Sequence, residues 1–446
     1  MAHLRSARLR EVLGAEVDDL AYDDIVGLVA SNVAESFDLD FKRDSYVSSD
    51  GGKKALAIDV AALANAAGGV IVLGVDEDDQ ARASAAPGVD TSDDEVRRLV
   101  QTVAAGVAPL PPFDVRAIPG RDGRPGFIAI AVARSALAPH AVVVHDTLRY
   151  PLRTGTTTRY LNEPEVAAAY RDRWTSASAR LERADTVEAD VVERLDGDSP
   201  WVVVSLVPEL PGHFDVTAAS YRAFEREVRD RSIHPLAGGG AAFHQVDVGF
   251  ERLTANGSLR VDGPDKGISA ALHTDGSGVV AAQCWDIRRG VQPPDPSHTI
   301  AEESLAALLA GSVQFLALHA RDRAQTSGTA LVRAFIVTAT SVDETYLGHA
   351  RQGFPVTNGR SITGRQSPVA TTYALVDAAA AGRAELLVAV RRLLVGLGHA
   401  FGLPELPQFT DAGALRWPYW SHHFRPAAKQ WADSHGVEID ESVADP

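Results

Sequence analysis

The sequence predicts an α+β protein built from two domains. Over the first 175 residues, helical patterns alternate with short strand patterns, as is typical of a mixed α and β domain. A charged stretch follows at 176–199, and a new apolar strand pattern, WVVVSLV, begins at 201. A chain of 446 residues has room for two or three domains of roughly 100–200 residues each. We therefore expect a first domain over 1–175, a linker over 176–199 and a second α+β domain over 200–446.

The composition is that of an ordinary soluble protein, with 45% hydrophobic and 23% charged residues. Cys284 is the only cysteine, which excludes an internal disulfide framework and a cysteine-rich zinc module and fits a reducing cytosol. The sequence has no run of about 18 apolar residues to span a membrane and no apolar signal core near its N-terminus. We expect a cytoplasmic protein. The net charge of −16 argues against nucleic-acid contact over the whole surface but leaves room for a local basic cleft.

The first domain opens with apolar residues at helical spacing over 17–33, behind an acidic first turn. Residues 37–42 alternate between apolar and polar, which predicts a strand with one polar face. The alanine-rich segment 53–66 predicts a helix that Gly68 and Gly69 end. The apolar run VIVLGV at 70–75 then predicts a buried strand.

The remainder of the first domain is marked by helix-capping residues. Ser92 and Glu95 have the spacing of a capping box for a helix over 93–106. Asn162 and Pro164 open a helix over 164–174. Between these helices, strand patterns lie near 113–118, 126–132, 141–144 and 148–153.

The second domain mixes strand and helix patterns but carries no motif of known chemistry. Its three consecutive glycines at 238–240 are not a phosphate-binding P-loop, because the G-x-x-x-x-G-K-[ST] pattern is absent. The helix predicted over 303–319 is largely apolar and is expected in the core or in a dimer interface. The aromatic-dense segment 414–424 fits core packing or a partner surface. By its position after the first domain, this domain is expected to sense a ligand or to regulate the first.

Three carboxylates and one lysine form a candidate catalytic set. Asp40 and Lys42 share one face of the predicted strand, Glu35 lies at its entrance and Asp76 follows the next apolar strand. If the two strands are neighbours, the carboxylates converge and suit Mg²⁺ or Mn²⁺. Such a metal polarises a phosphoryl oxygen and activates water, while Lys42 would stabilise the charge of the transition state. The alternative is that Asp40 and Lys42 are the solvated face of an edge strand.

Basic residues nearby are candidates for phosphate contacts. Lys53 and Lys54, two of only five lysines in the chain, open the predicted helix 53–66, where a cation is mildly unfavourable unless a phosphate lies near. Arg149, Arg153 and Arg159 are interleaved with tyrosines, and strand alternation places Arg149 and Arg153 on one face. The alternatives are a plain charged helix end and an ordinary surface hairpin.

Three blocks of sequence, in the same order as in the family, resemble the Schlafen AlbA_2 domain. They are E-S-x-x-L-D-F-K from Glu35 to Lys42, A-L-A-N-A-A-G-G-V-I-V-L-G-V-D from Ala62 to Asp76, and L-R-Y-P-L-R-T-G-T-T-T-R from Leu148 to Arg159. The resemblance covers roughly residues 17–175, under half of the chain. It implies nucleic-acid binding. In the animal Schlafen proteins, a metal-dependent endoribonuclease acting on tRNA and rRNA uses three acidic residues, which correspond here to Glu35, Asp40 and Asp76.

Two departures from the family pattern bear on these expectations. Asp40 stands where the family usually has glutamate, and the loop after Asp76 is longer and more acidic than the usual short form. Prokaryotic members are often described as DNA-binding or transcriptional regulators, and some are suspected in phage defence. Animal members pair two such lobes, whereas one is visible here, so a homodimer would build the equivalent groove.

The leading hypothesis is a cytosolic homodimer that cuts RNA, in particular tRNA, with Mg²⁺ or Mn²⁺ held by Glu35, Asp40 and Asp76 and with Lys42 on the scissile phosphate. The alternative is a DNA-binding regulator without catalysis, whose second domain senses a ligand.

Overall fold

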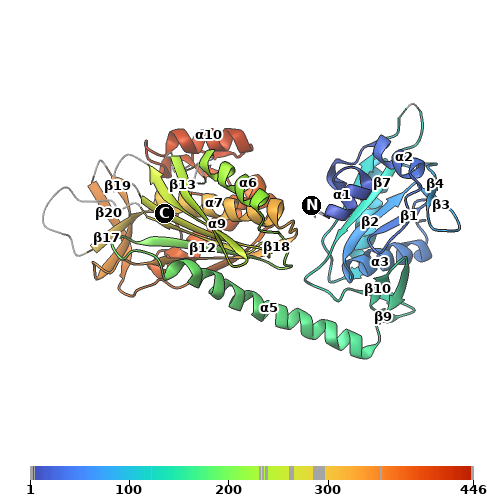
Figure 1. Cartoon of the computed structure of the whole chain (residues 1–446), viewed down its shortest axis with the longest axis horizontal. Coiled ribbons are helices and arrows are strands. Elements are labelled where there is room, and N and C mark those ends of the chain that lie inside the picture. Colours follow the sequence, from blue (N-terminus) through green and yellow to red (C-terminus); the bar gives the residue numbers. More distant parts are fainter. Residues whose placement is uncertain are drawn as a thin grey trace. The chain divides into compact units, whose positions relative to one another are not determined.

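The computed structural model describes residues 4, 6–121, 123–230, 233, 236, 240–260, 266–284, 297–351 and 354–442. It divides the chain into two compact units, Met1–Ser178 and Ala179–Pro446. Each unit has its own sheet and its own helices, which confirms the α+β prediction (Figure 1). Of the three consecutive glycines of the second domain, the two at 238 and 239 lie outside the described residues.

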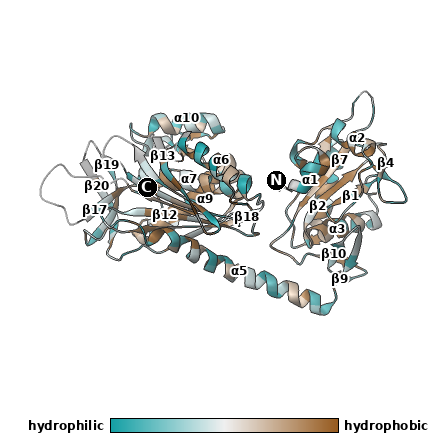
Figure 2. Cartoon of the chain, in the orientation of Figure 1, coloured by the Kyte–Doolittle hydropathy of each residue, from teal (hydrophilic) through white to brown (hydrophobic). Residues whose placement is uncertain are grey.

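Unit 1 is built on a four-stranded sheet with the order β1-β2-β7-β6, in which β1 and β2 run parallel and the remaining pairs antiparallel. The strands are β1 (Leu39–Lys42), β2 (Gly68–Leu73), β6 (Phe113–Ile118) and β7 (Phe127–Ala133). β2 and β7 are buried along their whole lengths, because helices cover both faces of the sheet. The apolar colouring gathers on these strands in Figure 2.

Two layers of helices enclose this sheet. On one face, α3 (Asp50–Ala64) and α4 (Asp93–Gly106) pack through Leu56, Val60 and Leu99. On the other face, α1 (Ala7–Leu13) and α2 (Tyr22–Ala30) form a second core with Ile25 and Phe127. Smaller sheets flank this sandwich: β3 (Asp76–Glu77) with β4 (Ala83–Ala85); β5 (Val107–Ala108) with β8 (Ala141–Val144) and β9 (Thr147–Arg149); β10 (Pro151–Thr154) with β11 (Thr157–Tyr160).

The helix predicted over 17–33 is interrupted. A single 3-10 turn, η1 (Val17–Asp19), is followed by α2, and the break falls where Leu20 turns into the core at 1% exposure. The Asp24 carboxylate accepts a hydrogen bond from the Ala21 N–H at 2.8 Å and so begins a new helix. By contrast, α4 has the predicted bounds of 93–106, with the Ser92 hydroxyl accepting from the Glu95 N–H.

Unit 2 is built on a seven-stranded antiparallel sheet with the order β13-β14-β15-β16-β12-β18-β21. Its strands are β12 (Trp201–Pro208), β13 (Gly240–Gly249), β14 (Arg252–Arg260), β15 (Lys266–His273), β16 (Gly278–Gln283), β18 (Thr329–Val337) and β21 (Ala370–Leu375). One face packs on the helices α6 (Ala218–Asp230), α7 (Glu302–Leu318), α8 (Val376–Ala381), α9 (Ala384–Ala400) and α10 (Arg425–His435). A second sheet joins β17 (Ser297–Ala301), β19 (Glu344–Arg351) and β20 (Phe354–Ile362), and a short pair joins β22 (Leu415–Arg416) and β23 (Ile439–Asp440).

The predicted linker over 176–199 is largely helical. Helix α5 (Glu163–Val192) continues through it, and Ala184, Val187 and Val191 are buried against the second face of the unit 2 sheet. These apolar residues repeat at helical spacing among charges, so the helix buries one stripe and leaves its charged side in water. The many charged residues of this stretch made its apolar helical spacing hard to recognise in the sequence.

The apolar helix of the second domain lies in the core. The span Glu302–Arg323, which comprises α7 and the following π-helical turn η3 (His319–Arg323), is long and apolar enough to cross a membrane. However, 89% of its most apolar window is buried inside the protein, as in the core helix of a soluble domain.

Candidate functional site

Asp40 lies at the centre of a buried ionic cluster on β1. Its side chain is 4% exposed, and both carboxylate oxygens are paired with cations. The Arg153 guanidinium donates from Nη1 to Oδ1 at 2.7 Å, and the Lys42 ammonium contacts Oδ2. Burial alone would lower the pKa of Lys42, but the Asp40 carboxylate outweighs burial and the pKa is raised. The predicted pairing of Asp40 with Lys42 on one strand face is therefore present, with Asp40 buried and the Lys42 side chain 36% exposed.

Glu35 belongs to the same cluster. Its side chain is 7% exposed, and Oε1 accepts a hydrogen bond from the Phe41 N–H at 2.7 Å. Oε2 lies 3.8 Å from Arg153 Nη2. Burial raises the pKa of Glu35 to about 7, and the neighbouring carboxylates of Asp40 and Glu77 add to the increase. Glu35 thus holds β1 in place while carrying a proton for part of the time near neutral pH.

A tyrosine and an aspartate that no sequence motif predicted complete the cluster. Tyr46 donates from its hydroxyl to Asp59 Oδ2 on α3 at 2.7 Å. Burial raises the pKa of Asp59, offset in part by that hydrogen bond, and burial together with Asp59 raises the pKa of Tyr46 well above its usual value. An acidic residue inside the apolar run L-A-I-D-V-A-A-L was the available signal for Asp59.

Two residues bring the elements of the cluster together. The Asn65 side chain, at the C-terminal end of α3, donates to the carbonyls of His140 at 2.9 Å and Pro151 at 2.7 Å, and it accepts from the His140 N–H at 2.6 Å. These bonds hold the start of β10, and with it Arg153, beside α3. Gly69 lets β2 approach β1, because a Cβ at this position would lie 2.5 Å from the Asp38 carbonyl oxygen.

The third predicted acid, Asp76, is placed differently. It lies on β3, its side chain is 29% exposed, and Oδ2 accepts from Arg43 Nη1 at 2.7 Å. Glu77, the next residue, is among the charges that raise the pKa of Glu35. Within the part of the chain that the structure describes, no group of three or more His, Cys, Asp or Glu side chains is placed to hold a metal ion. The predicted convergence of Glu35, Asp40 and Asp76 is absent from this arrangement.

The residues present therefore do not fit a resident Mg²⁺ or Mn²⁺ as they are arranged. Both oxygens of Asp40 are bonded to cations, and Glu35 faces the same guanidinium. A divalent ion would have to displace Arg153 or Lys42 to bind Asp40, because like charges repel strongly at such short range.

The predicted phosphate-binding arginines take three different positions. Arg153 is 8% exposed and paired with Asp40, so in this arrangement its guanidinium lies inside the domain, and its predicted contact with nucleic acid stays a prediction. Arg159 is exposed but makes two hydrogen bonds to the Glu165 carboxylate, at 2.9 and 2.8 Å. Arg149 is exposed at the end of β9, with its guanidinium 5.9 Å from the centre of the Tyr160 ring.

Arg149 and Arg153 lie on two different strands, because β9 ends at Arg149 and β10 begins at Pro151. The two arginines therefore do not share a strand face. β9 pairs with β8, whereas β10 pairs with β11. Tyr150, between the strands, instead contacts Tyr170 of α5, with the hydroxyl groups 3.5 Å apart. We predicted a single strand over 148–153, whereas the structure has two strands with different pairing partners. Alternation in the sequence does not reveal which strand lies alongside.

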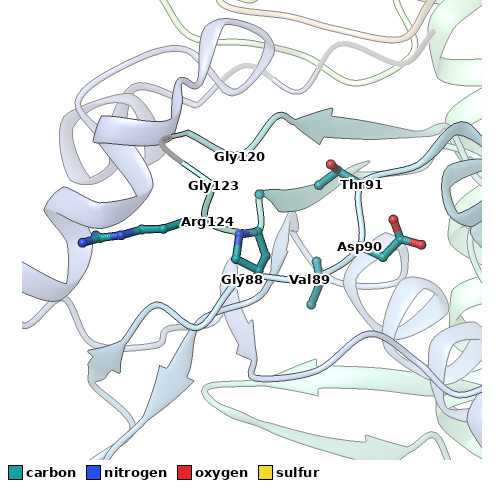
Figure 3. Close-up of a pocket in the computed structure, with 9 residues that line it drawn as sticks. Gly88, Val89, Asp90, Thr91, Gly120, Gly123 and Arg124 are labelled. Atoms are coloured by element: carbon teal, nitrogen blue, oxygen red, sulfur yellow. The ribbon is translucent and has the colours of Figure 1, made fainter.

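Lys53 and Lys54 lie in the first turns of α3, and both are exposed. Neither forms an ion pair with any residue that the structure describes. Together with Arg149, they are the predicted contacts whose charge is not offset by a described carboxylate. A surface hollow of about 570 Å³ lies elsewhere on unit 1, and Figure 3 shows Asp90 and Arg124 at its rim pointing in different directions. Among the described residues its lining is mainly glycine and proline, and the side chains of Asp90 and Arg124 do not point toward each other.

We expect the stability of unit 1 to fall as the pH rises from about 5 to about 8. In this window folded Glu35, with a pKa of about 7, still holds a proton that the unfolded chain, with a pKa of 4.5, has released. The loss is about 1–3 kcal/mol, since one pKa unit corresponds to about 1.4 kcal/mol. Hydrogen exchange of β1 peptides at pH 5 and pH 8 measures it, after correction for the intrinsic exchange rate.

Glu35→Gln keeps the acceptor for the Phe41 N–H and carries no charge, so this pH dependence should shrink in that variant. Glu11→Gln, on the exposed side of α1, is the matched control and should leave it intact. An equal pH dependence in wild type and Glu35→Gln would show that Glu35 is not its source.

Residues 35–162 match the model of the family described as Schlafen, AlbA_2, which confirms the predicted resemblance over that region. The match marks the N-terminal unit as nucleic-acid-related. No protein of curated function matches the chain.

Two solved structures are similar over part of the chain. The DIP2311 protein from Corynebacterium diphtheriae is 21% identical, with a TM-score of 0.24, over 37% of this chain and 29% of that one. This chain thus spans under a third of that protein. The N-terminal domain of a protein related to the ATP-dependent DNA helicase RecG, from Nitrosomonas europaea, is 17% identical, with a TM-score of 0.20, over 26% of this chain and 73% of that domain.

Proposed function

We propose that this protein, whose residues 35–162 form a Schlafen AlbA_2 domain, binds nucleic acid through unit 1 and does so without a metal. The observation that carries the proposal is the state of the charges in that domain. Asp40 is paired internally with Arg153 and Lys42, whereas Lys53, Lys54 and Arg149 stand exposed without a described acidic partner.

These charges suit a polyanion that is held by its backbone. Lys53 and Lys54 lie in the first turns of α3, where the helix dipole already favours an anion. Arg149 and the half-exposed Tyr160 ring offer one cation and one aromatic face, a combination that binds a phosphate beside an unstacked base. Because the whole chain carries a charge of −16, we expect these local contacts to set the affinity.

A metal-dependent endoribonuclease is the second candidate, with tRNA as its substrate and with a role in phage defence. The adjacency of Glu35, Asp40 and Lys42 on β1 favours it, because these are the residues that the family resemblance assigns to cleavage. Cleavage would require Arg153 to leave Asp40 and Asp76 to approach. Under either candidate function, we propose that the protein is a homodimer and that unit 2 senses a ligand.

The test measures binding and cleavage together. Labelled single-stranded RNA, bulk tRNA and duplex DNA are incubated with the protein in EDTA and in Mn²⁺, from 50 to 200 mM salt. Binding in EDTA is expected. The triple variant Lys53→Ala/Lys54→Ala/Arg149→Ala should weaken it at least tenfold and lower the salt slope by about 2, since each phosphate contact on a single strand contributes about 0.7.

The control is the variant Arg10→Ala/Arg97→Ala/Arg229→Ala, which removes three exposed arginines that are each paired with a carboxylate. It lowers the net charge equally and should bind almost as wild type does. No binding in EDTA, or equal losses in the two triple variants, would reject the proposal. Cleavage in Mn²⁺ that Asp40→Asn abolishes would move the assignment to the nuclease.

A further inference from the structure

Arg153 reaches the carboxylate cluster from 113 positions away in the sequence, and its whole guanidinium group is engaged there. Nη1 donates to Asp40 at 2.7 Å, Nε donates to the Gly155 carbonyl at 3.1 Å, and Nη2 donates to the Ser36 carbonyl at 3.3 Å. Nη2 also lies 3.8 Å from Glu35. The side chain is 6% exposed, so these contacts are made out of water.

The cluster holds one more carboxylate than it holds cations. Three carboxylates, Glu35, Asp40 and Asp59, face the two cations Lys42 and Arg153, and Tyr46 donates its hydroxyl to Asp59. Removal of Arg153 would leave Glu35 and Asp40 close together with Lys42 alone. Carboxylates in that situation take up a proton or a cation.

We propose that Arg153 is the built-in cation of this cluster: its guanidinium stands where a divalent metal would have to bind, and it ties the hairpin β10–β11 to β1. Arg153 is a positioning residue, since its contacts lie inside the domain. The planar fork of arginine is essential, because a lysine ammonium reaches Asp40 without bonding the Ser36 and Gly155 carbonyls in the same geometry. The proposal has two parts: the first is that Arg153 occupies the position of a metal, and the second is that it ties β10–β11 to β1. The first part does not depend on the proposed function.

A metal titration of the full-length protein tests the first part. Mn²⁺ is added from 10 μM to 10 mM, and hydrogen exchange of β1 and β10 peptides is followed in wild type, Arg153→Gln and Arg153→Lys. Wild type should show no saturable protection by Mn²⁺. Arg153→Gln should exchange faster than wild type in EDTA and regain protection with an apparent Kd at least tenfold below any seen for wild type. Asp40→Asn in the Arg153→Gln background should abolish that gain.

Arg153→Lys provides the readout for the second part. It keeps the charge, so Mn²⁺ should give it no protection, but it loses the fork, so the β10–β11 peptide should exchange faster than in wild type. Exchange in Arg153→Lys that equals wild type would overturn the positioning role.

Wild type and Arg153→Lys keep the proposal falsifiable if Arg153→Gln does not fold. Saturable, submillimolar Mn²⁺ protection of wild type that Asp40→Asn removes would overturn it, since the metal would then enter with Arg153 in place. Absence of any Mn²⁺ effect on a folded Arg153→Gln would overturn it as well. Neither measurement contains nucleic acid, so its failure is distinguishable from failure of the proposed function.

Discussion

Gly69→Ala is expected to destabilise unit 1 by about 3 kcal/mol, at the upper end of the cost of forcing a side chain against its surroundings. A Cβ at residue 69 would lie 2.5 Å from the Asp38 carbonyl oxygen and 2.8 Å from the Asp38 carbonyl carbon and Cα. Those atoms belong to the backbone that accepts the Val70 N–H at 2.8 Å, so they cannot move aside without opening the β1–β2 pairing. Asp40 and Lys42, which lie on β1, would move with it.

Hydrogen exchange of β2 and β7 peptides in the full-length protein measures the loss. The effect should be confined to unit 1, because unit 2 has a sheet and a core of its own. Gly51→Ala is the matched control: its Cβ would meet only the Ser49 hydroxyl, at 3.8 Å, in the first turn of α3. Equal protection in the two variants would contradict the steric argument.

Asn65→Ala is expected to cost about 2–4 kcal/mol, because three hydrogen bonds to backbone groups are lost at once and each is worth about 1 kcal/mol or more where its partner is left unpaired. The bonds join the end of α3 to His140 and Pro151 at 2.6–2.9 Å. His140 is fully buried, so no water replaces the lost partner at its N–H. The β10–β11 peptide, which carries Arg153, should show the largest gain in exchange.

Two variants sharpen this result. Asn65→Asp keeps the acceptor for His140 but replaces the donors with a carboxylate facing two carbonyls, so it should be at least as damaging as alanine. Asn162→Ala removes an exposed side chain that caps α5 through the Glu165 N–H, and it should cost no more than about 1 kcal/mol. A loss in Asn65→Ala as small as that in Asn162→Ala would show that β10 is held by other contacts.

Local signals in the sequence were sufficient for several elements. Helix α4 has its predicted bounds because Ser92 and the helical spacing of Leu99 and Val103 act within a few residues of each other. The resemblance over 35–162 rests likewise on contiguous blocks and is confirmed. Predictions of this kind hold where the stabilising partner is near in sequence.

The sequence by itself thus determined the α+β class, the nucleic-acid-related domain and the presence of Asp40 and Lys42 on one strand face. Only the tertiary structure decided what surrounds them. Arg153 enters from 113 positions away and pairs with Asp40, whereas Asp76 pairs with Arg43 on the surface. The physical reason is that burial and charge pairing depend on which segments lie side by side. The sequence around a carboxylate therefore does not reveal whether the carboxylate is free to bind a metal or is paired with a distant arginine.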